Sequence, residues 1–255
     1  MMPSLFLAHG SPMLAIEQNP YTDFLENIGR HIKPKAIVIF TAHWESDITT
    51  ISYTDEVYET IYDFYGFPDE MYTIKYPARG SKKAADMVKN QFQQQGIPFK
   101  LNMTRGLDHG SWTLLSRIYP NADIPVIQIS VNPFLEAENQ YKIGQSLKAL
   151  RAEDILIIGS GVTVHNLRAL NWNQTTPEAW AVEFDDWLID KIQQKDLDGL
   201  FKWEESAPNA RLAVPRPEHF VPFFIAVGSG DSLEDAKVIH RSYEFGTLSY
   251  LCFQF

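Results

Sequence analysis

The hydrophobic positions of this chain follow two patterns that alternate along its length. Short apolar runs of strand length are separated by longer amphipathic stretches of helix length, which is typical of α/β proteins with mostly parallel strands. We expect one α/β domain over residues 1–255, with a central mostly parallel or mixed sheet flanked by helices. The predicted strands are 5–8, 36–41, 49–53, 99–102, 126–131, 155–158 and 247–253, and the predicted helices are 21–31, 81–94, 111–119, 135–150, 177–193 and 217–227.

One stretch follows neither pattern. Residues 54–79 carry several tyrosines but no clear helical or strand periodicity. We expect a long irregular loop there, and such loops inside compact domains are commonly functional.

Composition narrows the class of protein. The 255 residues carry a formal net charge of −10 with scattered basic residues, which opposes nucleic-acid binding because phosphate contacts need clustered Lys and Arg. No apolar run approaches the roughly 20 residues that span a bilayer. The first residues lack the features of a secretory signal, and the single cysteine, Cys252, has apolar neighbours that favour a buried structural thiol. We expect a cytoplasmic protein without membrane or nucleic-acid partners.

Histidines follow three of the predicted strands. The run 5–8 leads into His9, the run 36–42 leads into His43, and the run 155–158 passes through Gly159-Ser160-Gly161 to His165. If these strands are parallel neighbours, the three side chains emerge at the carboxyl edge of the sheet, where open α/β proteins bind their ligands.

Two more histidines stand near predicted helix starts. His109 comes just before one helix, and His219 lies in the first turn of another, where a positive helix end would favour the neutral, metal-ligating imidazole. Histidines separated by long intervals are typical of a metal site assembled by folding, and imidazole suits iron, zinc and other first-row metals. We interpret His31 and His240 as ordinary structural or surface residues.

Other signatures are weaker. Gly159-Ser160-Gly161 lacks the third glycine and the Lys-Ser/Thr pair of a phosphate-binding loop. Ser160 also does not match the nucleophile elbow, which has a glycine two residues before and two residues after the serine, because Val162 occupies the later position. Among the tryptophans, only Trp44 and Trp112 are close enough in sequence to the candidate ligands to line a pocket.

Several longer runs resemble one known family, the DODA-type (DOPA 4,5-dioxygenase-like) branch of the class III extradiol ring-cleaving dioxygenases. The likeness extends over nearly the whole chain. The runs are His9-Gly10-Ser11-Pro12, Ala42-His43-Trp44-Glu45, Ile61-Tyr62-Asp63-Phe64-Tyr65-Gly66-Phe67-Pro68, Tyr76-Pro77-Ala78, Gly106-Leu107-Asp108-His109-Gly110-Ser111-Trp112, Gly159-Ser160-Gly161, Pro217-Glu218-His219-Phe220 and Gly246-Thr247-Leu248-Ser249-Tyr250.

The resemblance implies a metal held by His9, His43 and His219. The family histidine that matches His165 would act as acid/base, with a pKa near neutrality, or as a further ligand. The one that matches His109 would touch the substrate, with Asp108 or another acceptor fixing its tautomer.

The implied reaction opens a catechol-type aromatic ring with O2, using Fe(2+). An all-histidine ligand set is equally suited to zinc, so purified protein could contain Zn(2+). Tyr62 and Trp44, both within the matching runs, are the candidate substrate-binding residues.

Two other functions stay open at this point. A zinc-dependent hydrolase on the same scaffold would need a carboxylate base at the metal, for which Glu218 and Asp108 are the near candidates. A non-catalytic metal-binding protein is the other alternative. The sequence leaves the physiological substrate and the oligomeric state open.

Overall fold

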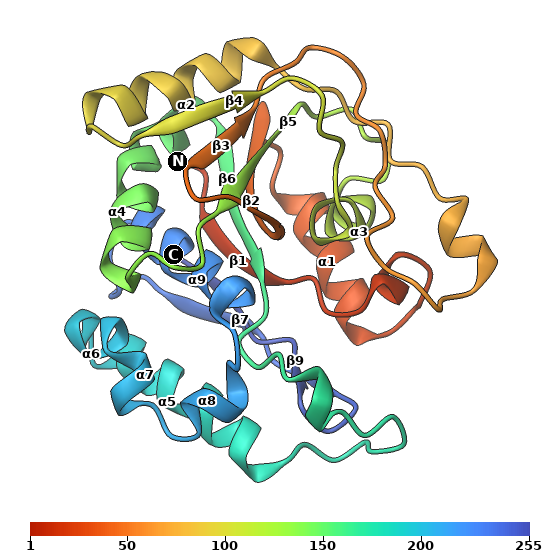
Figure 1. The fold of residues 1–255 in the computed structure, drawn as a ribbon, viewed down its shortest axis with the longest axis vertical. Coiled ribbons are helices and arrows are strands. Elements are labelled where there is room, and N and C mark those ends of the chain that lie inside the picture. The colour runs from red at the N-terminus through yellow and green to blue at the C-terminus, as the bar shows by residue number, and fades with distance from the viewer.

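The computed structural model describes residues 1–255 and contains an eight-stranded mixed sheet (Figure 1). Its strands are β1 (Ser4–Ala8), β2 (Ala36–Glu45), β3 (Thr49–Ser52), β4 (Phe99–Asn102), β5 (Val126–Val131), β6 (Ile155–Gly161), β7 (Lys237–His240) and β10 (Cys252–Gln254). The strand order is β4-β3-β5-β2-β6-β1-β10-β7. The four neighbours β5, β2, β6 and β1 run parallel, whereas β3, β10 and β7 form antiparallel pairs. The predicted mixed α/β sheet is confirmed.

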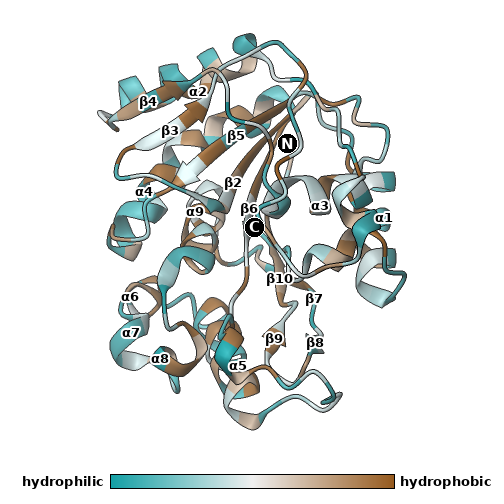
Figure 2. Cartoon of the chain, turned by 45° about the vertical axis from the view of Figure 1, so that its right-hand side comes forward, coloured by the Kyte–Doolittle hydropathy of each residue, from teal (hydrophilic) through white to brown (hydrophobic).

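The central strands are buried on both faces, which explains why they read as continuous apolar runs. In β2, Ile37 and Ile39 pack on one side of the sheet, while Val38 and Phe40 pack on the other, and none of the four is exposed. Figure 2 shows the hydrophobic colour concentrated in these strands, with hydrophilic residues on the outer helices.

Helices cover both faces of the sheet. α1 (Pro20–His31) packs on α3 (His109–Ile118) over one face. α2 (Lys82–Gln94), α4 (Ala137–Leu147) and α9 (Val221–Ser229) cover the other face. α5 (Ala179–Gln193), α6 (Leu197–Phe201), α7 (Trp203–Ser206) and α8 (Ala210–Ala213) form a group at the bottom of Figure 1, near the small pair β8 (Tyr243–Glu244) and β9 (Leu248–Ser249). None of the helices is long and apolar enough to cross a bilayer.

Three element predictions need correction. The predicted strand 247–253 divides into β9 and β10, because β9 pairs with β8 while β10 joins the main sheet beside β1. The predicted helix 217–227 begins as a separate 3₁₀ turn, Pro217–His219, before α9 starts at Val221. The sequence patterns also missed α6, α7, α8, β7 and β8, which are too short to show a period.

The order of the central strands decides how the site is built. β1 and β2 are not neighbours, because β6 lies between them and pairs with both. The last residues of β6 are Gly159-Ser160-Gly161, which lie beside the ends of β1 and β2. His43 lies among the last residues of β2, because this strand extends beyond the predicted end at 41 to Glu45. His9, which follows β1, and His43 therefore flank a strip of small residues.

Candidate active site

Three histidine side chains converge at the carboxyl edge of the sheet. The Nε2 atoms of His9 and His43 lie 3.0 Å apart, and those of His43 and His219 lie 3.2 Å apart. Nitrogens bound to a common ion at about 2.1 Å are separated by roughly 3.0–3.4 Å for ordinary coordination angles. The spacing of this triad fits a single first-row metal ion.

The other nitrogen of each ring faces a different partner. His9 Nδ1 lies 3.0 Å from the Ser160 hydroxyl, and because that hydroxyl donates to the Gly110 carbonyl it must accept the His9 proton. His43 Nδ1 lies 3.1 Å from Asp63, and His219 Nδ1 lies 3.0 Å from Glu218. Protons held at Nδ1 leave the three Nε2 lone pairs free, which is the tautomer that a metal ligand needs.

Burial favours the same state. Burial, followed by the neighbouring histidines, holds the pKa of His9 and of His219 well below the ordinary value. We expected a helix N-terminus to lower the pKa of His219, but the residue belongs to the 3₁₀ turn before α9, and burial is the main cause. Neutral imidazoles with converging lone pairs repel one another unless a cation lies between them, so these residues fit the metal that the sequence implied.

Glycine allows the segment of His219 to reach the sheet. A Cβ at Gly161 would lie 2.1 Å from the His219 carbonyl oxygen, so no larger residue fits there. The same carbonyl accepts a hydrogen bond from the Val162 N–H at 2.8 Å. The Gly-Ser-Gly run thus allows the His219 segment to pack closely, and its serine hydroxyl faces His9.

His109 stands beside the triad, with its ring centroid 3.9 Å from that of His43. Its Nδ1 lies 3.0 Å from Asp63, which also accepts a hydrogen bond from the His109 backbone N–H, so Asp63 takes the place beside His109 that the sequence had assigned first to Asp108. Asp108 instead accepts hydrogen bonds from Thr41 at 2.7 Å and Arg105 at 3.1 Å. Burial lowers the pKa of His109, although the contact with Asp63 opposes that shift.

Asp63 comes from the long irregular loop and was not predicted as a site residue. Burial by itself would raise its pKa, but its contacts with His109 and His43 hold the pKa well below the usual range. One indication was available in the sequence, because Asp63 lies in the run from Ile61 to Pro68 that resembles the family. This run is part of the long loop that we expected to be functional.

His165 lies beside His219, whereas Asp63 lies beside His43 and His109. The His165 ring stacks on that of His219 with centroids 3.6 Å apart, and one of its ring nitrogens lies within 4.8 Å of a Glu218 carboxylate oxygen and of a His219 ring nitrogen. Burial, followed by His43 and His109, lowers the pKa of His165 to about 4. That value is below the near-neutral pKa expected from the sequence, because the side chain is largely removed from water among other histidines.

The two predicted substrate-binding residues have different surroundings. The Trp44 ring is buried under the Arg105 guanidinium, 5.0 Å from its centroid. The Tyr62 hydroxyl donates to the Ile74 carbonyl at 2.7 Å. The aromatic residue that contacts a site histidine is Phe64, edge to face with His109 at 5.7 Å. Phe64 therefore lies beside the site histidines, and the sequence did not single it out.

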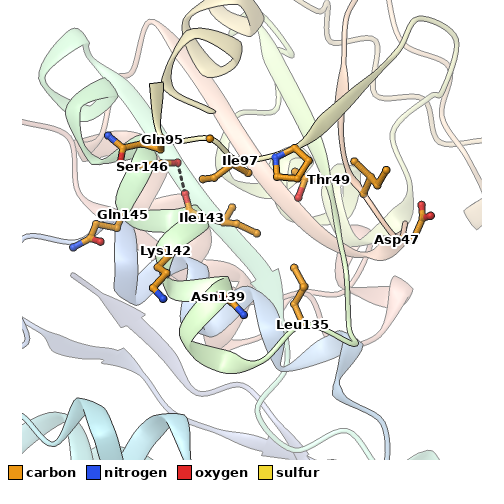
Figure 3. A pocket seen from close by; sticks show the side chains of 13 residues that line it. Asp47, Thr49, Gln95, Ile97, Leu135, Asn139, Lys142, Ile143, Gln145 and Ser146 are labelled. Atoms are coloured by element: carbon orange, nitrogen blue, oxygen red, sulfur yellow. Dashed lines mark hydrogen bonds between the residues drawn. The ribbon is translucent and has the colours of Figure 1, made fainter. Parts of the chain in front are cut away.

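A separate cavity of about 690 Å³ lies between the end of α2, the start of β3 and α4 (Figure 3). Its lining includes Asp47, Thr49, Asn139 and Lys142 but no histidine. This cavity therefore lacks the histidine side chains that a metal site of this kind needs.

Comparison with known proteins gives consistent matches. The model of the catalytic LigB subunit of aromatic ring-opening dioxygenase matches residues 3–253. A 4,5-DOPA dioxygenase extradiol of Beta vulgaris is 39% identical, over 99% of this chain and 96% of that protein. One of Escherichia coli (strain K12) is 36% identical, over 99% of this chain and 94% of that protein. The crystal structure of an uncharacterized protein from Escherichia coli K12 aligns with a TM-score of 0.84 at 32% identity, over 100% of this chain and 99% of that chain.

Proposed function

Because this chain belongs to the LigB family of aromatic ring-opening dioxygenases and is an extradiol ring-cleaving dioxygenase, we propose that it opens a catechol-type substrate at the histidine triad. His9, His43 and His219 are the proposed metal ligands. The observation that carries this assignment is the approach of their Nε2 atoms to 3.0 and 3.2 Å. An aromatic substrate and O2 follow from the family, and a DOPA-like catechol is the proposed substrate class because the relatives carry that name.

The family is metal-dependent, and the triad is a donor set that could hold the ion. We propose Fe(2+) for activity, with Zn(2+) as an ion that purified protein could carry, because three neutral imidazoles suit both. When bound, iron supplies the electron transfer between the aromatic ring and O2 that their spin states otherwise forbid.

Side chains of the protein are proposed to hold and transfer the protons of the reaction. His165, neutral beside the triad, is the proposed base for a catechol hydroxyl proton and the acid that returns it, a role typically worth 10²–10⁴ in rate. His109, with Nδ1 toward Asp63, presents Nε2 as a hydrogen-bond acceptor for the substrate. Phe64, Tyr62 and Trp44 are proposed to limit the pocket, with Phe64 nearest because it contacts His109.

One of the two candidate carboxylates argues against a zinc hydrolase. Glu218 faces His219 on one oxygen and Arg216 on the other, at 3.0 and 3.5 Å. Asp108 is engaged by Thr41 and Arg105. Asp108 is therefore not available to deprotonate a water molecule, whereas Glu218 uses only one oxygen on His219, so it is the family match that favours the dioxygenase over the hydrolase.

The cytoplasm is the proposed location, supported by a single buried cysteine that forms no disulfide.

The test is incubation of the iron-reconstituted protein with a panel of catechols under air. Ring opening yields a yellow semialdehyde and consumes O2, and the His9→Ala variant serves as the matched control. A hydrolase would consume no O2, and a non-catalytic binding protein would give no product. Either outcome would contradict the proposal.

A further inference from the structure

Asp63 contacts two site histidines that have different proposed roles. One carboxylate oxygen lies 3.1 Å from Nδ1 of His43, and the other lies 3.0 Å from Nδ1 of His109. The backbone N–H of His109 also donates to that second oxygen at 2.9 Å. The side chain is 24% exposed.

These contacts restrict both rings. A carboxylate is an acceptor only, so its closeness favours the tautomer with the proton on each Nδ1 that faces it, although Nδ1 of His109 is not aligned for a full hydrogen bond. The Nε2 of His43 is then free for the triad, and the Nε2 of His109 is free as an acceptor. Without the carboxylate, two rings with centroids 3.9 Å apart could take other tautomers or rotate.

We infer that Asp63 is a positioning residue that sets the tautomer of His43 and His109 together, coupling metal binding to substrate contact. This inference rests on the proposed function of the triad. It assigns the long loop a specific task, which is to deliver one carboxylate between two histidines that come from β2 and from the start of α3.

A simpler role is that Asp63 only tethers the loop to α3 through the His109 backbone N–H. Asp63→Asn separates the two roles. The amide has nearly the same size and keeps one oxygen for the backbone N–H, but its NH₂ group cannot accept a ring proton. One histidine must then change tautomer or lose its partner.

The experiment compares the wild type with Asp63→Asn, Asp63→Glu and the control Asp69→Asn, which changes an exposed carboxylate of the same loop. Zinc affinity is measured by competition with a chromophoric chelator, and ¹⁵N NMR of the zinc-loaded protein reports the histidine tautomers. We expect Asp63→Asn to weaken zinc binding on the order of 10- to 100-fold, the usual effect of removing a partner of a metal-ligating histidine. The signals of at least one of His43 and His109 should change, Asp63→Glu should recover part of the affinity, and Asp69→Asn should match the wild type.

In the iron-loaded enzyme, kcat should fall more than KM rises, because His109 is misoriented for the reaction. Unchanged zinc affinity and tautomers in Asp63→Asn, with only a lower melting temperature, would overturn the inference in favour of the tether. The zinc and NMR measurements need no turnover. A wild-type protein that opens no catechol would therefore refute the proposed function without touching the role of Asp63.

Discussion

Ser160→Ala tests how much the orientation of one ligand contributes to metal binding. The Ser160 side chain is fully buried, and its hydroxyl is the acceptor 3.0 Å from Nδ1 of His9. Alanine removes that acceptor and only one atom of volume. The substitution therefore removes two hydrogen bonds, the one from His9 and the one that Ser160 donates to the Gly110 carbonyl, and the second is lost equally with and without metal.

The size of the loss in metal affinity depends on whether the missing hydrogen bond destabilises the metal-bound or the metal-free protein. With metal on Nε2, the proton of His9 is confined to Nδ1 and faces no acceptor in Ser160→Ala, which costs about 1–3 kcal/mol. Without metal, the ring can change tautomer and avoid most of that cost. The difference falls on the metal-bound state, so metal affinity should drop roughly 10- to 100-fold.

The assay is a zinc titration against a chromophoric chelator, with thermal unfolding of the metal-free protein alongside it. Ser146→Ala is a matched control, because that buried hydroxyl donates to the Ile143 carbonyl within α4, away from the triad. We expect the control to bind zinc like the wild type. Equal affinity in Ser160→Ala and Ser146→Ala would refute the claim that Ser160 orients a ligand.

Three other outcomes are expected. His9→Ala or His43→Ala should abolish stoichiometric metal binding, because each removes one of the converging nitrogens; full occupancy by elemental analysis would contradict the ligand set. His165→Ala should retain metal and catechol binding but lose turnover by about 10²–10⁴, measured as O2 uptake; wild-type rates would remove its acid/base role. Burial raises the pKa of Cys252 to about 12, so the native thiol should not react with a disulfide reagent at pH 8. The thiol should react after the protein is unfolded in guanidinium. Rapid labelling of the native protein would contradict this prediction.

Part of the fold and of the site could be predicted from local pattern. The strands 99–102 and 126–131 have the predicted bounds, because the first alternates apolar and polar residues and the second is a short, fully buried and mostly apolar run. The places of His9 and His43 at strand ends are also local features. Five histidines, including His109, His165 and His219, were selected in this way, and the structure brings all five together.

The partners of those histidines were decided only by tertiary structure. Ser160 faces His9 because β6 inserts between β1 and β2. Asp63 replaces Asp108 as the acceptor for His109 because the long loop returns over the start of α3. A hydrophobic period records which face of an element is buried, but it carries no information about strand order or the path of a loop. Ring orientation depends on both, since a hydrogen bond forms only when groups distant in sequence meet at about 3 Å.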